Sequence, residues 1–497
     1  MSDNKKNNQN NAPIARQVRG FVDNRADFLT RRNALVGKIL ETYKLWGFEE
    51  LETGAMEFAD CLGKFLPDAD RPNEGVFALQ DDDEQWLSLR YDLTAPLARF
   101  VAQNYDAIPK PFRRAACGPV WRNEKPGPGR YREFWQCDAD IVGSALPQSD
   151  AEVIAMLATA LENAGIARNS YVVKISNRKL LDALLVSIGV PVEDISTRLT
   201  ILRAIDKLDR LGLDGVGALL GAGRKDQSGD FTKGAGLNAS QIDKVLAYIQ
   251  TRQETRAQTL ANLANLIGNN EIGAEGIAEL SAIDETLGAL GILPQMAEFD
   301  PAIVRGLEYY TGTVFEAEYL ETTIDEAGNE VRFGSIGSGG RYDDLVMRFR
   351  GERVPATGCS IGVSRLLAAL ECAGKMPEKM DGPVLVLVLD KDQIANYFQM
   401  VQELRNAGIK SEVYLGSAGM KAQMKYADRK NSPLVILEGS NEREAGIVTI
   451  KDLKLGAKLA SEITSNEEWR QGRPAQFEAS RADLVNIVRQ TLEQGAK

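Results

Sequence analysis

The chain contains no histidine in its 497 residues, although about ten would be expected at ordinary usage. This absence excludes every mechanism that needs an imidazole base, a His–Asp relay or a His-ligated metal. Any proton transfer must therefore use carboxylates, Cys, Lys, Tyr or the substrate itself.

Cysteine is scarce as well, with five residues at positions 61, 117, 137, 359 and 372. None of them forms a Cys-x-x-Cys pair or a zinc-binding spacing. This pattern excludes a disulfide framework and predicts reduced thiols in a cytoplasmic protein. Apolar runs of membrane-spanning length are missing, and residues 1–12 lack the apolar core of a signal peptide. We expect no membrane segment, and a disordered tail over residues 1–12.

Positive charge is in deficit, because 59 Lys and Arg residues stand against 70 Asp and Glu, giving a net charge of −11. Taken alone, this balance argues against nucleic-acid binding. In a chain long enough for about two to four domains, however, a local basic patch is sufficient for phosphate contact.

Against these absences stands one very polar segment, residues 118–140. It is predicted to form two strands around a Pro- and Gly-rich hairpin tip at residues 125–129. Because strand side chains alternate, the even positions of the second strand share one face. Those positions are Arg130, Arg132, Phe134, Gln136, Asp138 and Asp140, and Arg122 and Glu124 extend the set on the first strand. Arginine binds phosphate and a phenylalanine ring stacks on a base, so this face favours a nucleotide site. The alternative is a solvated sheet face whose charges form ion pairs.

The hydrophobic pattern predicts a helix over residues 28–46 and strands over residues 48–53 and 87–94. Strands and helices do not alternate regularly, which favours a mixed, mostly antiparallel sheet over a doubly wound one. Residues 180–293 carry long helical patterns and are interpreted as an inserted module. Residues 384–437 follow a polar linker and are predicted to form a βαβαβ unit in a separate α/β domain.

Three short motifs follow the polar segment along the chain. They are Arg305-Gly-Leu-Glu-Tyr-Tyr310, Gly339-Gly-Arg-Tyr-Asp343 and Gly358-Cys-Ser-Ile-Gly-Val-Ser-Arg365. Each is common by itself. Together with Arg122-Asn-Glu124 and the strand that begins at Arg130, they resemble the histidyl-tRNA synthetase family in order and spacing, from about residue 15 onward. The stretch from Arg122 to Arg130 is similar to the branch of that family found in alphaproteobacteria.

The resemblance implies an α+β class II synthetase core, an antiparallel sheet flanked by helices, with a helical insertion and a C-terminal α/β anticodon-binding domain. The catalytic core is expected in two segments, residues 13–178 with motifs 1 and 2 and residues 294–376 with motif 3. The insertion at 179–293 separates them, and the anticodon-binding domain follows at 383–497. The implied enzyme is a histidine–tRNA ligase that uses ATP and Mg²⁺ to activate L-histidine to histidyl-adenylate, and then transfers it to tRNA(His). It would be a homodimer through residues 28–48 and the segment around Gly54, where the family usually has a proline.

The same resemblance implies roles for individual residues. Arg305 and Arg122 would be the catalytic arginines at the α-phosphate, where two fixed cations stabilise growing charge. The ATP-binding set would be Arg122, Glu124, Arg130, Phe134 and Arg365. The histidine-binding set would be Asp92, Thr94, Gln136, Asp140, Arg305, Tyr309 and Tyr310, with Asp140 and Tyr310 at the imidazole. No protein metal site is expected. The histidine carboxylate is already a nucleophile, so this chemistry needs no imidazole base.

Because the chain has no histidine, few of its groups should titrate near neutral pH. The exception that we expect is a carboxylate with a shifted pKa in the pocket of Asp92 and Asp140.

Contact with tRNA is expected at Lys125 on the hairpin tip, and at Lys421 and Lys425 on one face of a helix over residues 420–428. A solvated helix face is the alternative for these two lysines. The tip lacks the Arg/Gln pattern with which many bacterial relatives read an extra 5′ guanosine. The branch that it resembles is associated with tRNA lacking that base.

The alternative to the ligase is a function of another class. It is that of the catalytically inactive, synthetase-like regulatory subunit of ATP phosphoribosyltransferase in histidine biosynthesis. Such a relative usually lacks the C-terminal domain and loses residues of the Arg305 type. This chain keeps Arg122, Arg305, Arg365 and the whole α/β tail, which favours the ligase.

Overall fold

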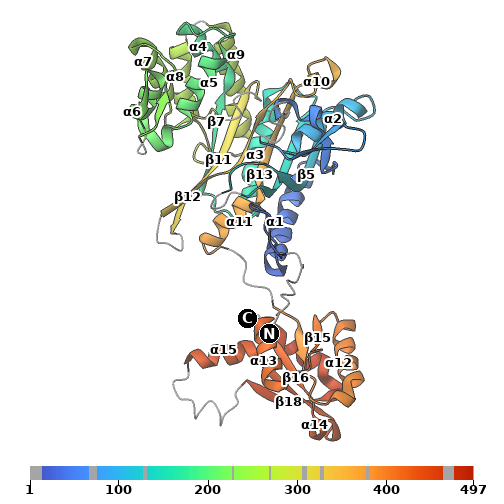
Figure 1. Ribbon diagram of the computed structural model, residues 1–497. Helices are drawn as coiled ribbons and strands as arrows, with labels where there is room; N and C mark the ends of the chain where they lie inside the picture. Colours follow the sequence, from blue (N-terminus) through green and yellow to red (C-terminus); the bar gives the residue numbers. More distant parts are fainter. Residues whose placement is uncertain are drawn as a thin grey trace, which may run out of the picture. The chain divides into compact units, whose positions relative to one another are not determined.

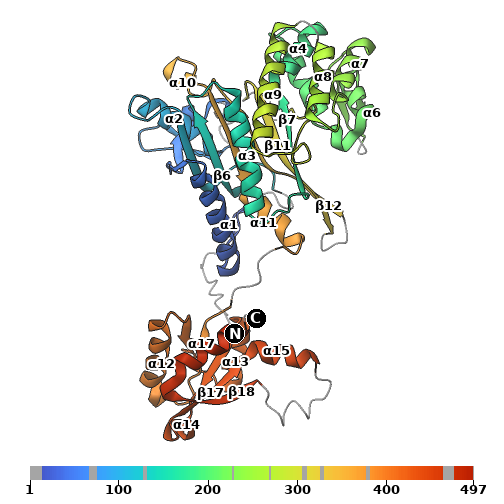
Figure 2. The same cartoon turned by 180° about the vertical axis from the view of Figure 1, so that it is seen from behind.

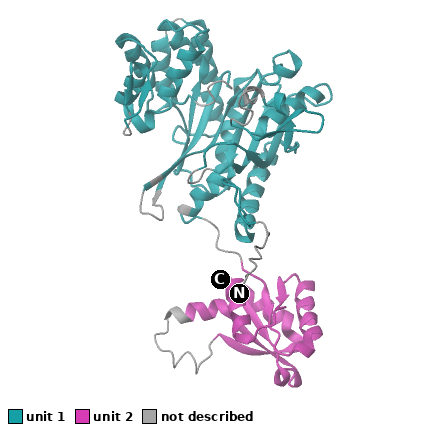
Figure 3. Cartoon of the chain, viewed as in Figure 1, with its two compact units in different colours: residues 1–377 teal, residues 378–497 magenta. Residues whose placement is uncertain are grey.

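A computed structural model divides the chain into two compact units, residues 1–377 and 378–497 (Figure 3). The structure describes residues 14–65, 75–126, 131–225, 229–267, 270–304, 310–324, 330–375, 381–462 and 475–495. The predicted tail at residues 1–12 lies outside these ranges. Among the helices that they contain, none combines the length and apolar character needed to cross a bilayer.

An eight-stranded sheet organises the first unit (Figure 1). The inner strands pair antiparallel, and the two edge strands pair parallel to their neighbours. The predicted antiparallel sheet flanked by helices is thus confirmed. In spatial order the strands are β1 (Glu49–Glu50), β5 (Phe112–Trp121), β6 (Glu133–Val142), β13 (Ala356–Gly362), β12 (Glu330–Arg341), β11 (Thr313–Ile324), β7 (Tyr171–Asn177) and β10 (Ala297–Phe299).

Helices α1 (Ala26–Leu45) and α3 (Pro147–Asn163) run side by side across one face of this sheet (Figures 1 and 2). Their apolar residues form one buried cluster with the odd-numbered side chains of β6. Pro147 occupies the first turn of α3, where its missing N–H costs no hydrogen bond. Gly165 ends the helix with a φ of +109°, a conformation that favours glycine. This packing leaves the even-numbered side chains of β6 on the opposite, polar face.

A helix begins where the sequence predicted the end of a strand. The predicted strand over residues 87–94 stops at Leu89, and the carboxylate of Asp92 accepts hydrogen bonds from the backbone N–H groups of Thr94 (3.0 Å) and Ala95 (2.8 Å). A side-chain oxygen in this position satisfies the free donors of a helix start, so the strand does not continue and α2 begins at Thr94. The remaining elements of the first unit outside the helical module are β2 (Met56–Phe58), η1 (Ala59–Phe65), β3 (Ala78–Gln80), β4 (Trp86–Leu89), α2 (Thr94–Asn104), α10 (Met347–Arg350) and α11 (Val363–Cys372).

Helices fill the residues between β7 and β10, and Figure 1 shows them in green beyond the β7 side of the sheet. Their buried Leu180, Ile201 and Ile283 belong to the same apolar cluster as the sheet and α3. The module therefore packs continuously onto the unit that contains it. Its elements are α4 (Arg178–Ser187), α5 (Ile195–Ile205), α6 (Leu208–Leu220), β8 (Gly223–Lys225), β9 (Phe231–Lys233), α7 (Ala239–Ile249), α8 (Arg256–Ile267) and α9 (Glu271–Ala289).

The second unit is an α/β domain around a five-stranded sheet in the order β15-β14-β16-β17-β18. The first three strands are parallel, as the predicted βαβαβ unit requires, and the last two add antiparallel pairs that the prediction omitted. The strands are β14 (Val384–Val386), β15 (Ser411–Val413), β16 (Leu434–Leu437), β17 (Ile447–Asp452) and β18 (Gln476–Ser480). The helices are η2 (Lys391–Gln393), α12 (Ile394–Asn406), α13 (Met420–Arg429), α14 (Ser440–Glu444), α15 (Leu453–Glu462), η3 (Arg481–Asp483) and α17 (Leu484–Gly495).

Candidate active site

A pocket of about 420 Å³ opens on the polar face of the eight-stranded sheet. The β5–β6 hairpin forms one wall, β12 and β13 form the floor beside it, and the start of α11 closes the far side. Five residues predicted from the sequence line this pocket: Arg122, Glu124, Phe134, Gln136 and Arg365. Strand alternation on β6 and the turn into α11 thus bring together side chains more than 200 positions apart.

Arg122 directly follows β5 and stands against two aromatic rings. Its guanidinium carbon lies 4.3 Å from the centre of the Tyr91 ring and 5.1 Å from that of Phe134. Its Nε donates a long hydrogen bond of 3.4 Å to the backbone carbonyl of Tyr91. Ring faces and one weak hydrogen bond hold the side chain without neutralising its charge, so Arg122 remains able to bind an anion in the pocket.

Arg365 faces the same pocket from the first turn of α11. Its Nη1 donates a 2.9 Å hydrogen bond to the backbone carbonyl of Ser335 on β12, which fixes the direction of the side chain. Glu124 lies at the mouth, where it accepts a 3.2 Å hydrogen bond from the Tyr91 hydroxyl. Lys125, next to it, is exposed. The pocket therefore offers two cations, an aromatic ring and an accessible carboxylate.

Further along β6, the polar face is buried. Gln136 donates a 2.6 Å hydrogen bond from Nε2 to the Ser360 hydroxyl, while its Oε1 has no partner among the described residues. Asp140 accepts a hydrogen bond from the Tyr342 hydroxyl, and its Oδ2 lies 3.3 Å from Nη2 of the buried Arg114. A Cβ at Gly358, opposite Asp140, would come within 2.1 Å of this carboxylate, so only glycine leaves it room.

Two carboxyls share this buried strand face, and their environment shifts both. Burial raises the pKa of Asp140, against the opposing effects of Arg114 and Tyr342. Burial and the neighbouring Asp140 raise the pKa of Asp138 to about 7. The half-buried Tyr310 lies in the same field, because burial and the charges of Asp138 and Asp140 raise the pKa of its phenol well above the usual value. Perturbed groups of this kind cluster at binding sites.

Several other predicted site residues are not in the pocket lining or lie outside the described ranges. Asp92 and Thr94 stand at the start of α2, where one Asp92 oxygen accepts the N–H groups of Thr94 and Ala95, and the Asp92 charge acts on Asp138, Asp140 and Tyr310. Lys421 and Lys425 are exposed on α13 of the second unit. Arg130, Arg305 and Tyr309 fall outside the described residues.

Three polar partners of the site were not predicted from the sequence. Tyr91 supports Arg122 and Glu124, Arg114 pairs with Asp140, and Tyr342 donates to Asp140. A signal for Arg114 existed, since Arg113 and Arg114 are the two charges of the otherwise apolar strand β5 and strand alternation sends them to opposite faces. Tyr342 belongs to the motif at residues 339–343, to which the sequence alone assigned no role.

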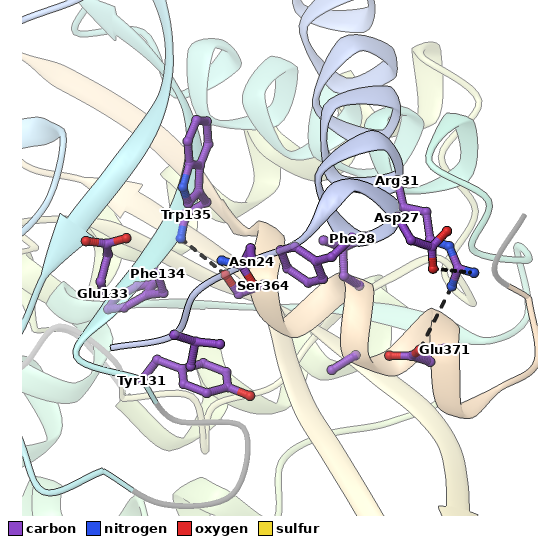
Figure 4. A pocket seen from close by; sticks show the side chains of 13 residues that line it. Asn24, Asp27, Phe28, Arg31, Tyr131, Glu133, Phe134, Trp135, Ser364 and Glu371 are labelled. Atoms are coloured by element: carbon purple, nitrogen blue, oxygen red, sulfur yellow. Dashed lines mark hydrogen bonds and ion pairs between the residues drawn. The ribbon is translucent and has the colours of Figure 1, made fainter. Parts of the chain in front are cut away.

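A second, smaller hollow of about 180 Å³ lies behind Phe134 (Figure 4). Its walls come from the start of α1, from β6 and from α11. The backbone N–H of Trp135 donates a 3.3 Å hydrogen bond to the Ser364 hydroxyl, and Arg31 forms ion pairs with Asp27 (3.1 Å) and Glu371 (3.9 Å). Because Phe134 and Ser364 border both hollows, these contacts support the wall of the larger pocket.

The antiparallel sheet flanked by helices, with one arginine after the hairpin strand and another at the start of α11 facing one pocket, defines a class II aminoacyl-tRNA synthetase. The sequence profile of the family described as histidyl-tRNA synthetase matches residues 20–366, and that of the anticodon binding domain matches residues 383–490. The chain belongs to the histidyl-tRNA synthetase family.

Similar proteins cover almost the whole chain. A histidine–tRNA ligase of Caulobacter vibrioides is 56% identical over 493 residues, which is 99% of either chain. One from Bartonella bacilliformis is 54% identical over 481 residues, or 96% of this chain and 97% of the relative. The crystal structure of a histidyl-tRNA synthetase from Nostoc sp. PCC 7120 matches with a TM-score of 0.72 and 26% identity, over 96% of this chain and 100% of the other. The predicted family is confirmed, and so is the choice of the ligase over the regulatory subunit.

Proposed function

We infer that the chain activates L-histidine with ATP to form histidyl-adenylate and then transfers the histidyl group to tRNA(His). The observation that carries this is the pocket in which Arg122, Phe134 and Arg365 meet, adjoining the buried polar face of β6, in a chain whose relatives over nearly its full length are histidine–tRNA ligases. The test is exchange of pyrophosphate into ATP by the purified chain. Exchange that requires histidine supports the function, and exchange absent with all twenty amino acids overturns it.

In the proposed reaction, a carboxylate oxygen of histidine attacks the α-phosphorus of ATP, and pyrophosphate leaves. Arg122 binds the α-phosphate oxygens and Arg365 the γ-phosphate, while Phe134 packs against adenine. Arg305 is proposed as a second cation opposite Arg122. Both arginines act on charge that grows in the transition state, which is where fixed donors contribute most. Glu124 and Arg130 complete the proposed ATP-binding set.

The histidine substrate is assigned to the region of the site around Asp92, Thr94, Gln136, Asp140, Arg305, Tyr309 and Tyr310. Gln136 supports the assignment through its free, buried Oε1, which needs an N–H donor. Asp140 and Tyr310 are proposed to read the imidazole ring. A buried site built to hydrogen-bond ring nitrogens rejects isosteres that lack them.

We propose that Mg²⁺ accompanies ATP. Magnesium usually keeps several waters and binds through one or two carboxylates together with substrate phosphates. The Glu124 carboxylate fits this role, because it lies in the pocket wall with one oxygen held by the Tyr91 hydroxyl. Within the described ranges no cluster of three or more acidic or thiol side chains forms a metal site of its own.

The proposed tRNA contacts are Lys125 beside the pocket mouth and Lys421 and Lys425 on α13. All three are exposed, which supports electrostatic contact with phosphates. The proposed domains keep the boundaries given above, at residues 13–178, 179–293, 294–376 and 383–497, and the proposed location is the cytoplasm.

We also propose a homodimer through residues 28–48 and the segment around Gly54. An apolar surface next to Gly54 supports it, because Met56, Phe58 and Leu79 are 41%, 52% and 48% exposed. The strand register places Phe58 and Leu79 on either side of Leu87, so they share one face of the small sheet. Exposed apolar faces mark interaction surfaces.

Light scattering at micromolar concentration should give twice the chain mass, and a Phe58→Asp variant should shift toward the monomer. A monomeric wild-type chain would contradict the proposal.

A further inference from the structure

Asp138 lies between Gln136 and Asp140 on the polar face of β6, and it is almost completely buried, at 2% exposure. Its register partners are Ala116 on β5 and Ser360 on β13. Because side chains alternate along a strand, Asp138 shares its face with Phe134 and Gln136, which line the pocket. It was not among the predicted site residues.

The carboxylate of Asp138 is not satisfied by the surrounding protein. Ser360 is its hydrogen-bonding neighbour, and Oδ1 has no partner among the described residues. An unpaired buried carboxylate is costly, and a protein retains such a group where a ligand or reaction uses it. Gln136, one step along the same face, also presents a free acceptor oxygen. The Asp140 Oδ2 on the other side of Asp138 has no hydrogen-bond partner among the described residues either, and three acceptors without donors on one strand face point to a ligand rich in N–H groups.

The position of Asp138 connects it with the region of the site assigned to the imidazole ring. Among the carboxylates that act on the Tyr310 phenol, Asp138 has the largest effect, ahead of Asp140 and Asp92. Asp140 is engaged already by Tyr342 and Arg114. Each of the two aspartates on β6 thus keeps one oxygen without a hydrogen-bond donor among the described residues, and Asp138 is the one that acts more strongly on Tyr310.

We propose that Asp138 is a specificity-determining residue of the amino-acid site, whose carboxylate accepts a hydrogen bond from an N–H of the substrate imidazole. This inference rests on the proposed function. A substrate ring without that N–H leaves the carboxylate buried and unpaired, so Asp138 contributes to the choice of histidine by rejecting isosteres as well as by binding the correct ring.

Charged or titratable groups from the elements packed around Asp138, some of them on the other face of the sheet, act electrostatically on its carboxyl. They are Asp140 and Cys137 on β6, Arg114 on β5, Cys359 on β13, Tyr43 on α1, Arg90 and Asp92 before α2, and Tyr310. Burial and the Asp140 charge dominate, so the pKa of Asp138 rises to about 7. The carboxyl is therefore mostly protonated below pH 6 and ionised above pH 8, and only the ionised form makes the charge-assisted bond.

The experiment compares histidine binding by the full-length wild-type chain and its Asp138→Asn variant, by calorimetry from pH 5.5 to 8.5. Free histidine titrates identically in both series, so its own pKa cancels in the ratio of the two dissociation constants. That ratio should be close to one at pH 5.5 and should rise to about tenfold or more at pH 8, the loss expected when a charged acceptor is replaced by a neutral one. A ratio that stays flat, or stays near one at pH 8, overturns the proposal.

Asp150→Asn is the matched control, because Asp150 is also buried and has a pKa raised to about 6, but pairs with Arg341 beneath the sheet. Its ratio should not change with pH. Asp138→Asn should keep the ATP affinity and unfold in urea at no lower concentration than wild type, since it removes an unpaired charge. Lower stability with loss of ATP binding would show a structural role and overturn the proposal.

A wild-type chain without histidine-dependent exchange refutes the proposed function itself, whereas normal exchange with a flat ratio refutes only this inference.

Discussion

Replacing Arg122 with alanine tests the assignment of the pocket to the α-phosphate. In the structure the side chain makes two ring contacts, at 4.3 and 5.1 Å, and one 3.4 Å hydrogen bond. Partly exposed cation–π contacts contribute about 0.5–1 kcal/mol each, and a long hydrogen bond adds little. The variant should therefore lose only about 1–2 kcal/mol of stability and remain folded.

The catalytic loss should be much larger. Removing one preorganised donor from a transition state costs about 10²–10³-fold in kcat, or roughly 3–4 kcal/mol. Single-turnover formation of histidyl-adenylate, followed as release of pyrophosphate, should slow by that factor while the dissociation constant of ATP changes less than about tenfold. Arg122→Lys should recover some of the rate, because it keeps the charge but loses the two-pronged geometry.

Arg113→Ala is the control for this prediction. Arg113 lies at the other end of β5, on the sheet face covered by α3, where it makes a two-pronged ion pair with Glu152 at 2.8 Å. Its loss should lower stability without slowing adenylate formation. If Arg122→Ala keeps a rate within about threefold of wild type, or if Arg113→Ala slows the reaction equally, the assignment of Arg122 is wrong.

Three further predictions concern neighbouring groups. Arg305→Ala should cut adenylate formation by about a hundredfold or more, with both substrates bound within roughly tenfold of wild type, and near-normal pyrophosphate exchange would remove Arg305 from the mechanism. Asp140→Asn should weaken histidine by about 1–3 kcal/mol with little effect on ATP, measured by calorimetry, and equal weakening of both would indicate misfolding. Burial raises the pKa of Asp138 to about 7 and that of Asp150 to about 6, so the folded chain holds these protons more tightly than the unfolded chain. Protonation of the two carboxyls therefore stabilises the fold, and that stability is lost as pH rises through those values. Unfolding of the ligand-free chain in urea should thus become easier by about 2–4 kcal/mol from pH 5 to pH 8, and an unchanged midpoint would refute the shifts.

Strand alternation explains why so much of the pocket could be predicted. The even positions of β6 were placed on one polar face from the sequence, and the structure has Phe134, Gln136, Asp138 and Asp140 there. The pairing of Arg114 with Asp140 was not predicted. That pairing depends on the register of β5 against β6, which a single strand pattern does not contain.

Other differences arose where a side chain competes with the local pattern. The apolar run that ends near Thr94 resembled a strand, but the Asp92 carboxylate caps a helix there. In the second unit, β17 and β18 pair antiparallel beyond the predicted βαβαβ unit, because their pattern is half-polar and carries less signal than the buried parallel strands. A shifted carboxylate was expected in the pocket of Asp92 and Asp140, and Asp138, on which both of their charges act, has its pKa raised to about 7 there.

The most direct test of the central claim is charging of tRNA(His) transcripts with labelled histidine by the purified chain, in the presence of ATP and Mg²⁺. Two transcripts are compared, one with and one without an extra 5′ guanosine. The account predicts histidyl-tRNA that requires ATP and histidine, with the transcript lacking the added base as a good substrate. No charging of either transcript, by a chain that binds ATP, would contradict it.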